Sequence, residues 1–95
     1  MIEIDRESMT PMYVQLASVL RERIRRGDIP VGRRIPSYYE LEQQTGGAVS
    51  RRTIKSAIEV LAAEGIVQGA QGKGVFVIAK PEDGPPTTDR PAPDS

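Results

Sequence analysis

A serine followed by three nearby cations is the part of the chain best suited to chemistry. Ser50 is of a type that caps helices, so we expect a helix to begin directly after it. Arg51, Arg52 and Lys55 would then project from its first turns. Arginine can donate two hydrogen bonds to one guanine, and all three cations can neutralise phosphates. Thr53 adds a hydroxyl for a phosphate and a methyl group for a thymine.

The alternative interpretation of these cations is a solvated helix face with no ligand. We favour recognition of duplex DNA, because the three cations stand together at a capped helix N-terminus and no acidic residue is interleaved among them.

A glycine-rich segment carries a further cation. Residues 66–68 and 75–78 are expected to form two short strands, with Gln71, Gly72 and Lys73 at the tip between them. Glycine lets a backbone approach a phosphate or a groove wall closely, so we expect this basic tip to enter a minor groove. A hairpin that only reverses the chain is the alternative.

Three more candidates lie before and within the preceding helix. Ser37 and Glu40 have the spacing of a capping box, and Ser37 is also a candidate DNA contact. The hydroxyl of Tyr39 can reach a phosphate, and Arg34 can contact the DNA backbone. The alternatives are that Tyr39 covers the domain edge and that Arg34 makes a surface ion pair.

Cap residues and apolar spacing predict three helices to position these side chains. The first begins at Pro11, in the first helical position, after the N-cap Thr10. The second covers about two turns after Ser37, and the third follows Ser50. A very short strand at Ile35 joins the hairpin. The fold class is therefore mainly α with a small β-hairpin (α+β), a winged helix-turn-helix of three helices and a two- to three-stranded wing.

The composition excludes several classes of site. The chain has no Cys and no His, so disulfides, Cys/His zinc sites and His-based triads are excluded. Its carboxylates are scattered and no nucleotide-binding glycine motif leads into a helix, so we expect no enzyme, no metal and no cofactor. No apolar run has the length of a membrane span, and no signal peptide is evident. We expect a cytoplasmic protein that contacts no membrane.

Charge is unevenly distributed along the chain. The formal net charge is +0, from 13 basic and 13 acidic residues. Residues 10–80 hold 11 basic and 6 acidic side chains, a net charge of +5. We predict an N-terminal arm over 1–10, a basic DNA-binding winged helix over 11–80, and a disordered, acidic, Pro-rich tail over 81–95.

Several ordered blocks of sequence carry a family resemblance. They are Pro11-Met12-Tyr13-Val14-Gln15-Leu16, Ile24, Gly27, Gly32-Arg33-Arg34-Ile35-Pro36-Ser37, Glu40-Leu41, Val49-Ser50-Arg51, Thr53-Ile54, Leu61, Glu64-Gly65 and Gln71-Gly72-Lys73-Gly74-Val75-Phe76-Val77. With them, residues 2–79 resemble the N-terminal DNA-binding domain of GntR-family bacterial transcription regulators. The resemblance implies a third helix in the major groove, a wing tip in the minor groove, and a homodimer on an inverted-repeat operator. The dimer would form through the arm and first helix or only on DNA.

The chain departs from the family pattern in four places. Tyr38-Tyr39 replaces a common Glu-Arg pair whose arginine often contacts DNA. The turn before Val49 is two residues longer, at Gly47-Ala48, and Thr45 replaces an apolar residue. In residues 81–95 we expect no counterpart of the family's sensor and dimerisation domain, so no segment is assigned to a small-molecule effector.

The resulting hypothesis is a sequence-specific DNA-binding transcription regulator that represses by occupying an operator. The alternative is a winged-helix module for protein–protein interaction without specific DNA binding. The two differ in the salt dependence of DNA affinity, which is steep only for a protein that neutralises phosphates.

Overall fold

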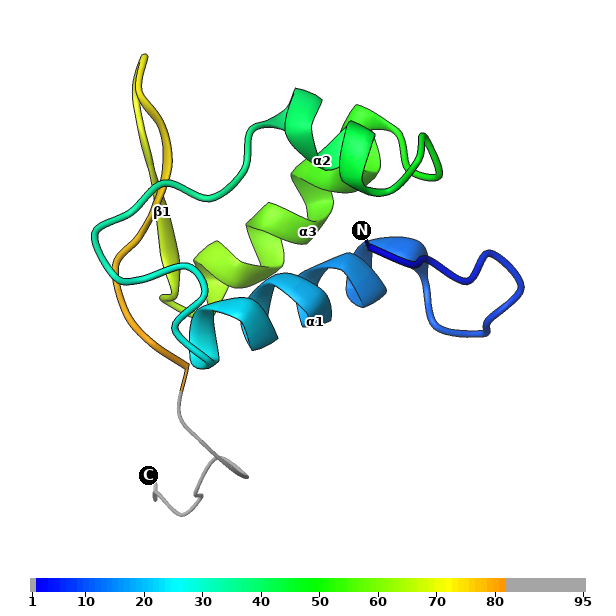
Figure 1. Cartoon of the computed structure of the whole chain (residues 1–95), viewed down its shortest axis with the longest axis horizontal. Helices are drawn as coiled ribbons and strands as arrows, with labels where there is room; N and C mark the ends of the chain where they lie inside the picture. The colour runs from blue at the N-terminus through cyan, green and yellow to red at the C-terminus, as the bar shows by residue number, and fades with distance from the viewer. Residues whose placement is uncertain (1, 82–95) are drawn as a thin grey trace.

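The computed structural model describes residues 2–81, so the predicted tail lies outside them from residue 82 on. Three helices and a two-stranded antiparallel sheet follow in the order α1 (Met12–Arg25), α2 (Tyr38–Gln44), α3 (Arg51–Ala63), β1 (Val67–Ala70) and β2 (Gly74–Val77). The sheet stands at one end of the helical layer (Figure 1). This architecture confirms the predicted winged helix-turn-helix class.

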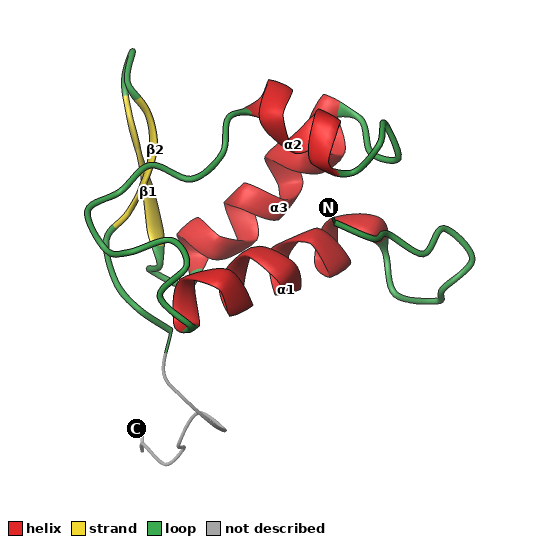
Figure 2. Cartoon of the chain, viewed as in Figure 1, coloured by secondary structure: helices red, strands yellow, loops and turns green. Residues whose placement is uncertain are grey.

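The core lies mainly between α1 and α3, which run past one another (Figure 2). Each helix turns a stripe of apolar side chains inward at helical spacing. The members with the lowest exposure are Leu16, Leu20 and Ile24 of α1 and Ile54, Ala57 and Leu61 of α3. Full burial of each Leu or Ile contributes about 1.5–3 kcal/mol, which fixes α3 against the rest of the domain.

The start of α1 differs from the prediction. Pro11 is the N-cap, not the first helical residue, and no side chain caps the helix. Its ψ of 148° keeps it extended, while its carbonyl already accepts the N–H of Gln15 at 3.1 Å. Thr10 lies outside the helix, where its carbonyl accepts a 2.8 Å bond from Gln15 Nε2 and its N–H donates to Ser8 Oγ. The prediction of Thr10 as the N-cap is therefore wrong.

The segment before α1 is a strap, without regular secondary structure. Ile2 is buried, and its N–H donates to the carbonyl of Gln44 at the end of α2 over 2.8 Å. Asp5 and Gln15 exchange two hydrogen bonds of 2.8 and 2.9 Å. Arg6 Nη2 donates to the carbonyl of Ala48 at 3.3 Å, so the strap ties the start of α1 to the turn before α3.

The wing has the predicted third strand in minimal form. Strands β1 and β2 pair from Val67 with Val77 to Ala70 with Gly74. Arg34 forms an isolated antiparallel bridge with Phe76, and next to it Ile35 donates its N–H to the carbonyl of Val75 at 2.9 Å. The segment between α1 and α2 is thus bonded to the wing.

The turn between α2 and α3 is built around a buried threonine. Thr45 replaces an apolar residue without leaving its hydroxyl unpaired, because Oγ1 donates to the carbonyl of Leu41 at 2.9 Å. Gly46 and Gly47 follow with φ of 64° and 78°, in the left-handed region that favours glycine. These residues carry the chain from the end of α2 to the cap of α3.

Candidate nucleic-acid interface

The N-terminus of α3 has the predicted cap. Ser50 is extended, with φ −85° and ψ 168°, and its Oγ accepts the N–H of Thr53 at 3.2 Å. The hydroxyls of the two residues also lie 3.2 Å apart. The N–H groups of Arg51 and Arg52 donate to no acceptor within residues 2–81. This end of the helix therefore offers free donors and a positive dipole to an anion.

The three predicted cations of α3 are all exposed. The side chain of Arg51 is 63% exposed, and Arg52 and Lys55 also lie in the exposed class. Thr53 is half-buried, with its hydroxyl turned toward Ser50. The predicted residues of α3 thus lie together within its first one and a half turns. Their contacts with DNA remain a prediction.

An acidic residue, which the sequence pattern did not suggest, lies beside these cations. Glu42 Oε2 of α2 is 3.3 Å from Arg51 Nε. The assumption that no acid is interleaved holds along the sequence but is wrong in space, because the turn after α2 folds Glu42 back toward the start of α3. Only the packing angle of the two helices creates this pair, so spacing along the chain gave no signal for it.

The start of α2 has the predicted capping box. Ser37 Oγ accepts the N–H of Glu40 at 3.1 Å, and Glu40 Oε1 accepts the N–H of Ser37 at 2.8 Å. This reciprocal pair fixes the first turn. Tyr39 follows on that turn and is 62% exposed, so it can meet a ligand.

The wing tip consists of Gln71, Gly72 and Lys73, all exposed. The N–H of Lys73 donates to the carbonyl of Ala70 at 2.9 Å, which closes the turn. Gly72 has a φ of 77°, a conformation that glycine adopts at little cost. The tip therefore presents a cation and an amide on a tight, small-residue turn.

Arg34 packs against the wing. A Cβ at Gly74 would lie 2.7 Å from Arg34 Cδ, so the arginine stem passes directly over this glycine. Gly74 also has a φ of 109°. Arg34, Ser37, Gly72 and Lys73 line one hollow of about 270 Å³ between the wing and the start of α2.

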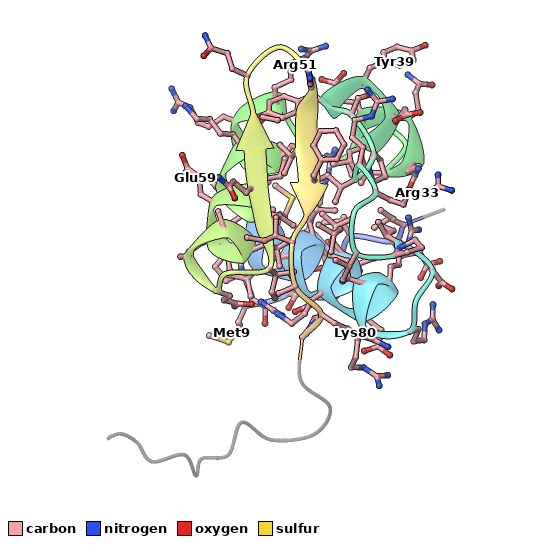
Figure 3. The ribbon with its side chains drawn as sticks, turned by 90° about the vertical axis from the view of Figure 1, so that its left-hand side faces the viewer. Met9, Arg33, Tyr39, Arg51, Glu59 and Lys80 are labelled. Atoms are coloured by element: carbon pink, nitrogen blue, oxygen red, sulfur yellow. The ribbon has the colours of Figure 1, made fainter. Side chains whose placement is uncertain are left out.

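These elements meet at one end of the molecule. In Figure 3, Arg51 and Tyr39 lie at the same end as the wing tip, while Met9 and Lys80 lie at the opposite end. We call the predicted DNA-binding residues of these elements the reading surface. Its exposed cations are Arg34, Arg51, Arg52, Lys55 and Lys73, and its other members are Ser37, Tyr39, Ser50, Thr53, Gln71 and Gly72. Its chemistry suits a polyanion with hydrogen-bonding groups.

Within residues 2–81 no three His, Cys, Asp or Glu side chains are grouped to hold a metal ion. In the same stretch, no helix has the length and apolar character that crossing a bilayer requires.

Comparison with known proteins agrees with this geometry. The family model described as "Bacterial regulatory proteins, gntR family" matches residues 12–77. The HTH-type transcriptional repressor NagR of Bacillus subtilis is 32% identical over 81 residues, which are 85% of this chain and 32% of NagR. The chain therefore spans about a third of the length of that relative.

Two solved structures match this chain over most of their own length. YtrA from Sulfolobus acidocaldarius, a GntR-family transcription factor, is 35% identical with a TM-score of 0.71, over 82% of this chain and 80% of that one. AraR(DBD), solved in complex with operator ORR3, is 39% identical with a TM-score of 0.68, over 78% and 87% of the two chains.

Proposed function

The chain belongs to the gntR family of bacterial regulatory proteins, and from this we propose that it is a sequence-specific DNA-binding transcription regulator. The protein would act by binding an operator through its reading surface. Repression is the direction we propose, as the name of the relative NagR indicates for that protein. AraR(DBD), a similar domain, was solved with operator DNA.

The observation that carries the proposal is the start of α3. There a capped helix end has free N–H groups and three exposed cations, and a basic wing tip stands at the same end of the molecule. In winged helices of this geometry the N-terminal residues of the third helix enter the major groove. Arg51 would contact a guanine, Arg52 and Lys55 phosphates, and Lys73 at the wing tip the minor groove.

Two copies are proposed to bind one operator. A single domain covers only one half-site, and one half-site supplies little specificity in a genome. An inverted repeat bound by a homodimer, assembled in solution or on the DNA, doubles the number of base contacts. We further propose that the protein acts in the cytoplasm, where its DNA would be.

Selection from a random duplex library tests the proposal. The expected result is an enriched inverted repeat, whose affinity falls with salt by about 0.9 logarithmic units of slope for each phosphate contact. No enrichment, with weak binding that is flat in salt, would favour a protein-docking module instead.

Arg51→Ala is expected to weaken binding to the enriched site by about 1–3 kcal/mol, with little change on a scrambled duplex. Lys80→Ala is the matched control, because it removes a cation at the opposite end of the molecule and should leave both affinities unchanged. Undiminished operator binding by a folded Arg51→Ala protein would remove Arg51 from the base-reading residues.

A further inference from the structure

Glu42 is an acid beside the cations at the start of α3. Its carboxylate lies 3.3 Å from Arg51 Nε, with side-chain exposures of 29% for Glu42 and 63% for Arg51. The other acid of α2, Glu40, is engaged in the capping box. Glu42 alone among the acids of α2 therefore acts on a cation of α3.

The backbone that carries Glu42 is well anchored. Its carbonyl accepts the N–H of Gly47 at 2.9 Å and the hydroxyl of Thr45 at 3.2 Å. The neighbouring Leu41 is fully buried. A carboxylate on such a base can restrain the long and otherwise mobile side chain of Arg51.

The pair has little to offer the stability of the fold. Exposed ion pairs contribute little because water screens them and two long side chains lose their freedom. A carboxylate next to a phosphate-binding surface also weakens affinity for every DNA sequence by repulsion. Since the pair adds little stability and no overall affinity, the remaining effect of Glu42 on Arg51 is on discrimination between DNA sequences.

We infer that Glu42 is a positioning residue that determines specificity, an inference that rests on the proposed DNA-binding function. Glu42 holds the guanidinium of Arg51 at its Nε edge. The terminal nitrogens Nη1 and Nη2 make no hydrogen bond within residues 2–81, so both can be directed to one guanine. Their two donors match the O6 and N7 acceptors of that base.

The same contact opposes non-specific binding. An unrestrained arginine can turn toward the nearest phosphate on any sequence. Glu42 keeps Arg51 from doing so and repels the phosphate itself. Glu42 thereby favours the correct site and disfavours the others, the two ways in which specificity is built.

The test compares affinities for the selected operator and a scrambled duplex of equal length, by fluorescence anisotropy at fixed salt. Glu42→Gln should bind the scrambled duplex more tightly and lose about two- to fivefold of the ratio between the two affinities, the size of effect that an exposed ion pair can exert. Glu59→Gln is the matched control, because it removes the same charge from an exposed site of α3 that lies away from Arg51 (Figure 3). Its ratio should equal that of the wild-type protein, and thermal melts should show all variants folded.

A double-mutant cycle identifies the route of the effect. In an Arg51→Ala background, Glu42→Gln should leave the ratio unchanged, because the residue that it positions is gone. An unchanged ratio in the single Glu42→Gln variant would overturn the inference. An equal loss with and without Arg51 would also overturn it, since Glu42 would then act on DNA directly. Wild-type protein that binds both duplexes equally would instead overturn the proposed function, and this inference with it.

Discussion

Three glycines of the wing differ in what an alanine would meet, and they give a graded prediction. Gly69 has an ordinary φ and open space around its position. Gly72 has open space but a φ of 77°, and Gly74 has both a φ of 109° and the stem of Arg34 at 2.7 Å from the added Cβ. Alanine should therefore cause no strain at Gly69, backbone strain alone at Gly72, and backbone strain together with a steric clash at Gly74.

The magnitudes follow from these three environments. Gly69→Ala should be neutral or stabilise by up to about 1 kcal/mol, since alanine restricts the unfolded chain. Gly72→Ala should destabilise by about 1–2 kcal/mol, the cost of a left-handed residue. Gly74→Ala should destabilise by about 1.5–4.5 kcal/mol, because strain of about 1–3 kcal/mol adds to about 0.5–1.5 kcal/mol for forcing Arg34 off its rotamer.

Thermal unfolding followed by circular dichroism measures the series. One kcal/mol corresponds to about 4–8 °C in the midpoint of a domain of this size, so adjacent members should be resolved. Arg34→Ala combined with Gly74→Ala removes the collision and should bring the loss close to that of Gly72→Ala. Equal midpoints for Gly69→Ala and Gly74→Ala would refute the reasoning, and a double variant no more stable than Gly74→Ala would refute the collision alone.

Three further outcomes are expected. Ser50→Ala should cost about 1 kcal/mol of stability in denaturant unfolding, through loss of the cap of α3; an unchanged midpoint would contradict the capping role. Leu41→Ala should cost about 2–5 kcal/mol, whereas Thr45→Val should cost no more than about 1 kcal/mol, because the Leu41 carbonyl keeps the N–H of Thr45; equal losses would contradict this. The pKa of Glu22 should lie below its ordinary value, since Arg25 donates to its carboxylate, and NMR titration of Arg25→Gln should show it restored. The associated stability is present above the unfolded-state pKa and is lost as pH falls through the folded one.

Elements fixed by local chemistry could be predicted from the sequence. The capping box at Ser37, the cap at Ser50 and the glycine-bounded wing turn each depend on residues within a few positions of one another. The start of α1 was misplaced because local rules favour Thr10 as the N-cap and Pro11 as the first helical residue, whereas Pro11 is extended and stands at the N-cap without a side-chain cap. In the observed register the side chain of Gln15 folds back and donates hydrogen bonds to the strap. This contact joins residues too far apart for local sequence rules to predict.

Contacts between elements could not be predicted in this way. The approach of Glu42 to Arg51 depends on the angle between α2 and α3, and the passage of Arg34 over Gly74 depends on where the wing meets the preceding segment. No periodicity encodes such distances. For the same reason the sequence placed cations on the reading surface without showing which of them is restrained.

Restrained and unrestrained cations of the reading surface are expected to have different roles in binding DNA. Arg52, Lys55 and Lys73 are exposed and make no ion pair within residues 2–81, so each can follow the phosphates of any sequence. Arg51 lies 3.3 Å from Glu42, which by the inference above restrains its side chain. Contacts that adapt supply affinity that salt weakens, whereas a contact that cannot adapt distinguishes one base from another. Raising the salt concentration should therefore weaken binding to operator and scrambled duplexes together, and the ratio between them should change far less than either affinity.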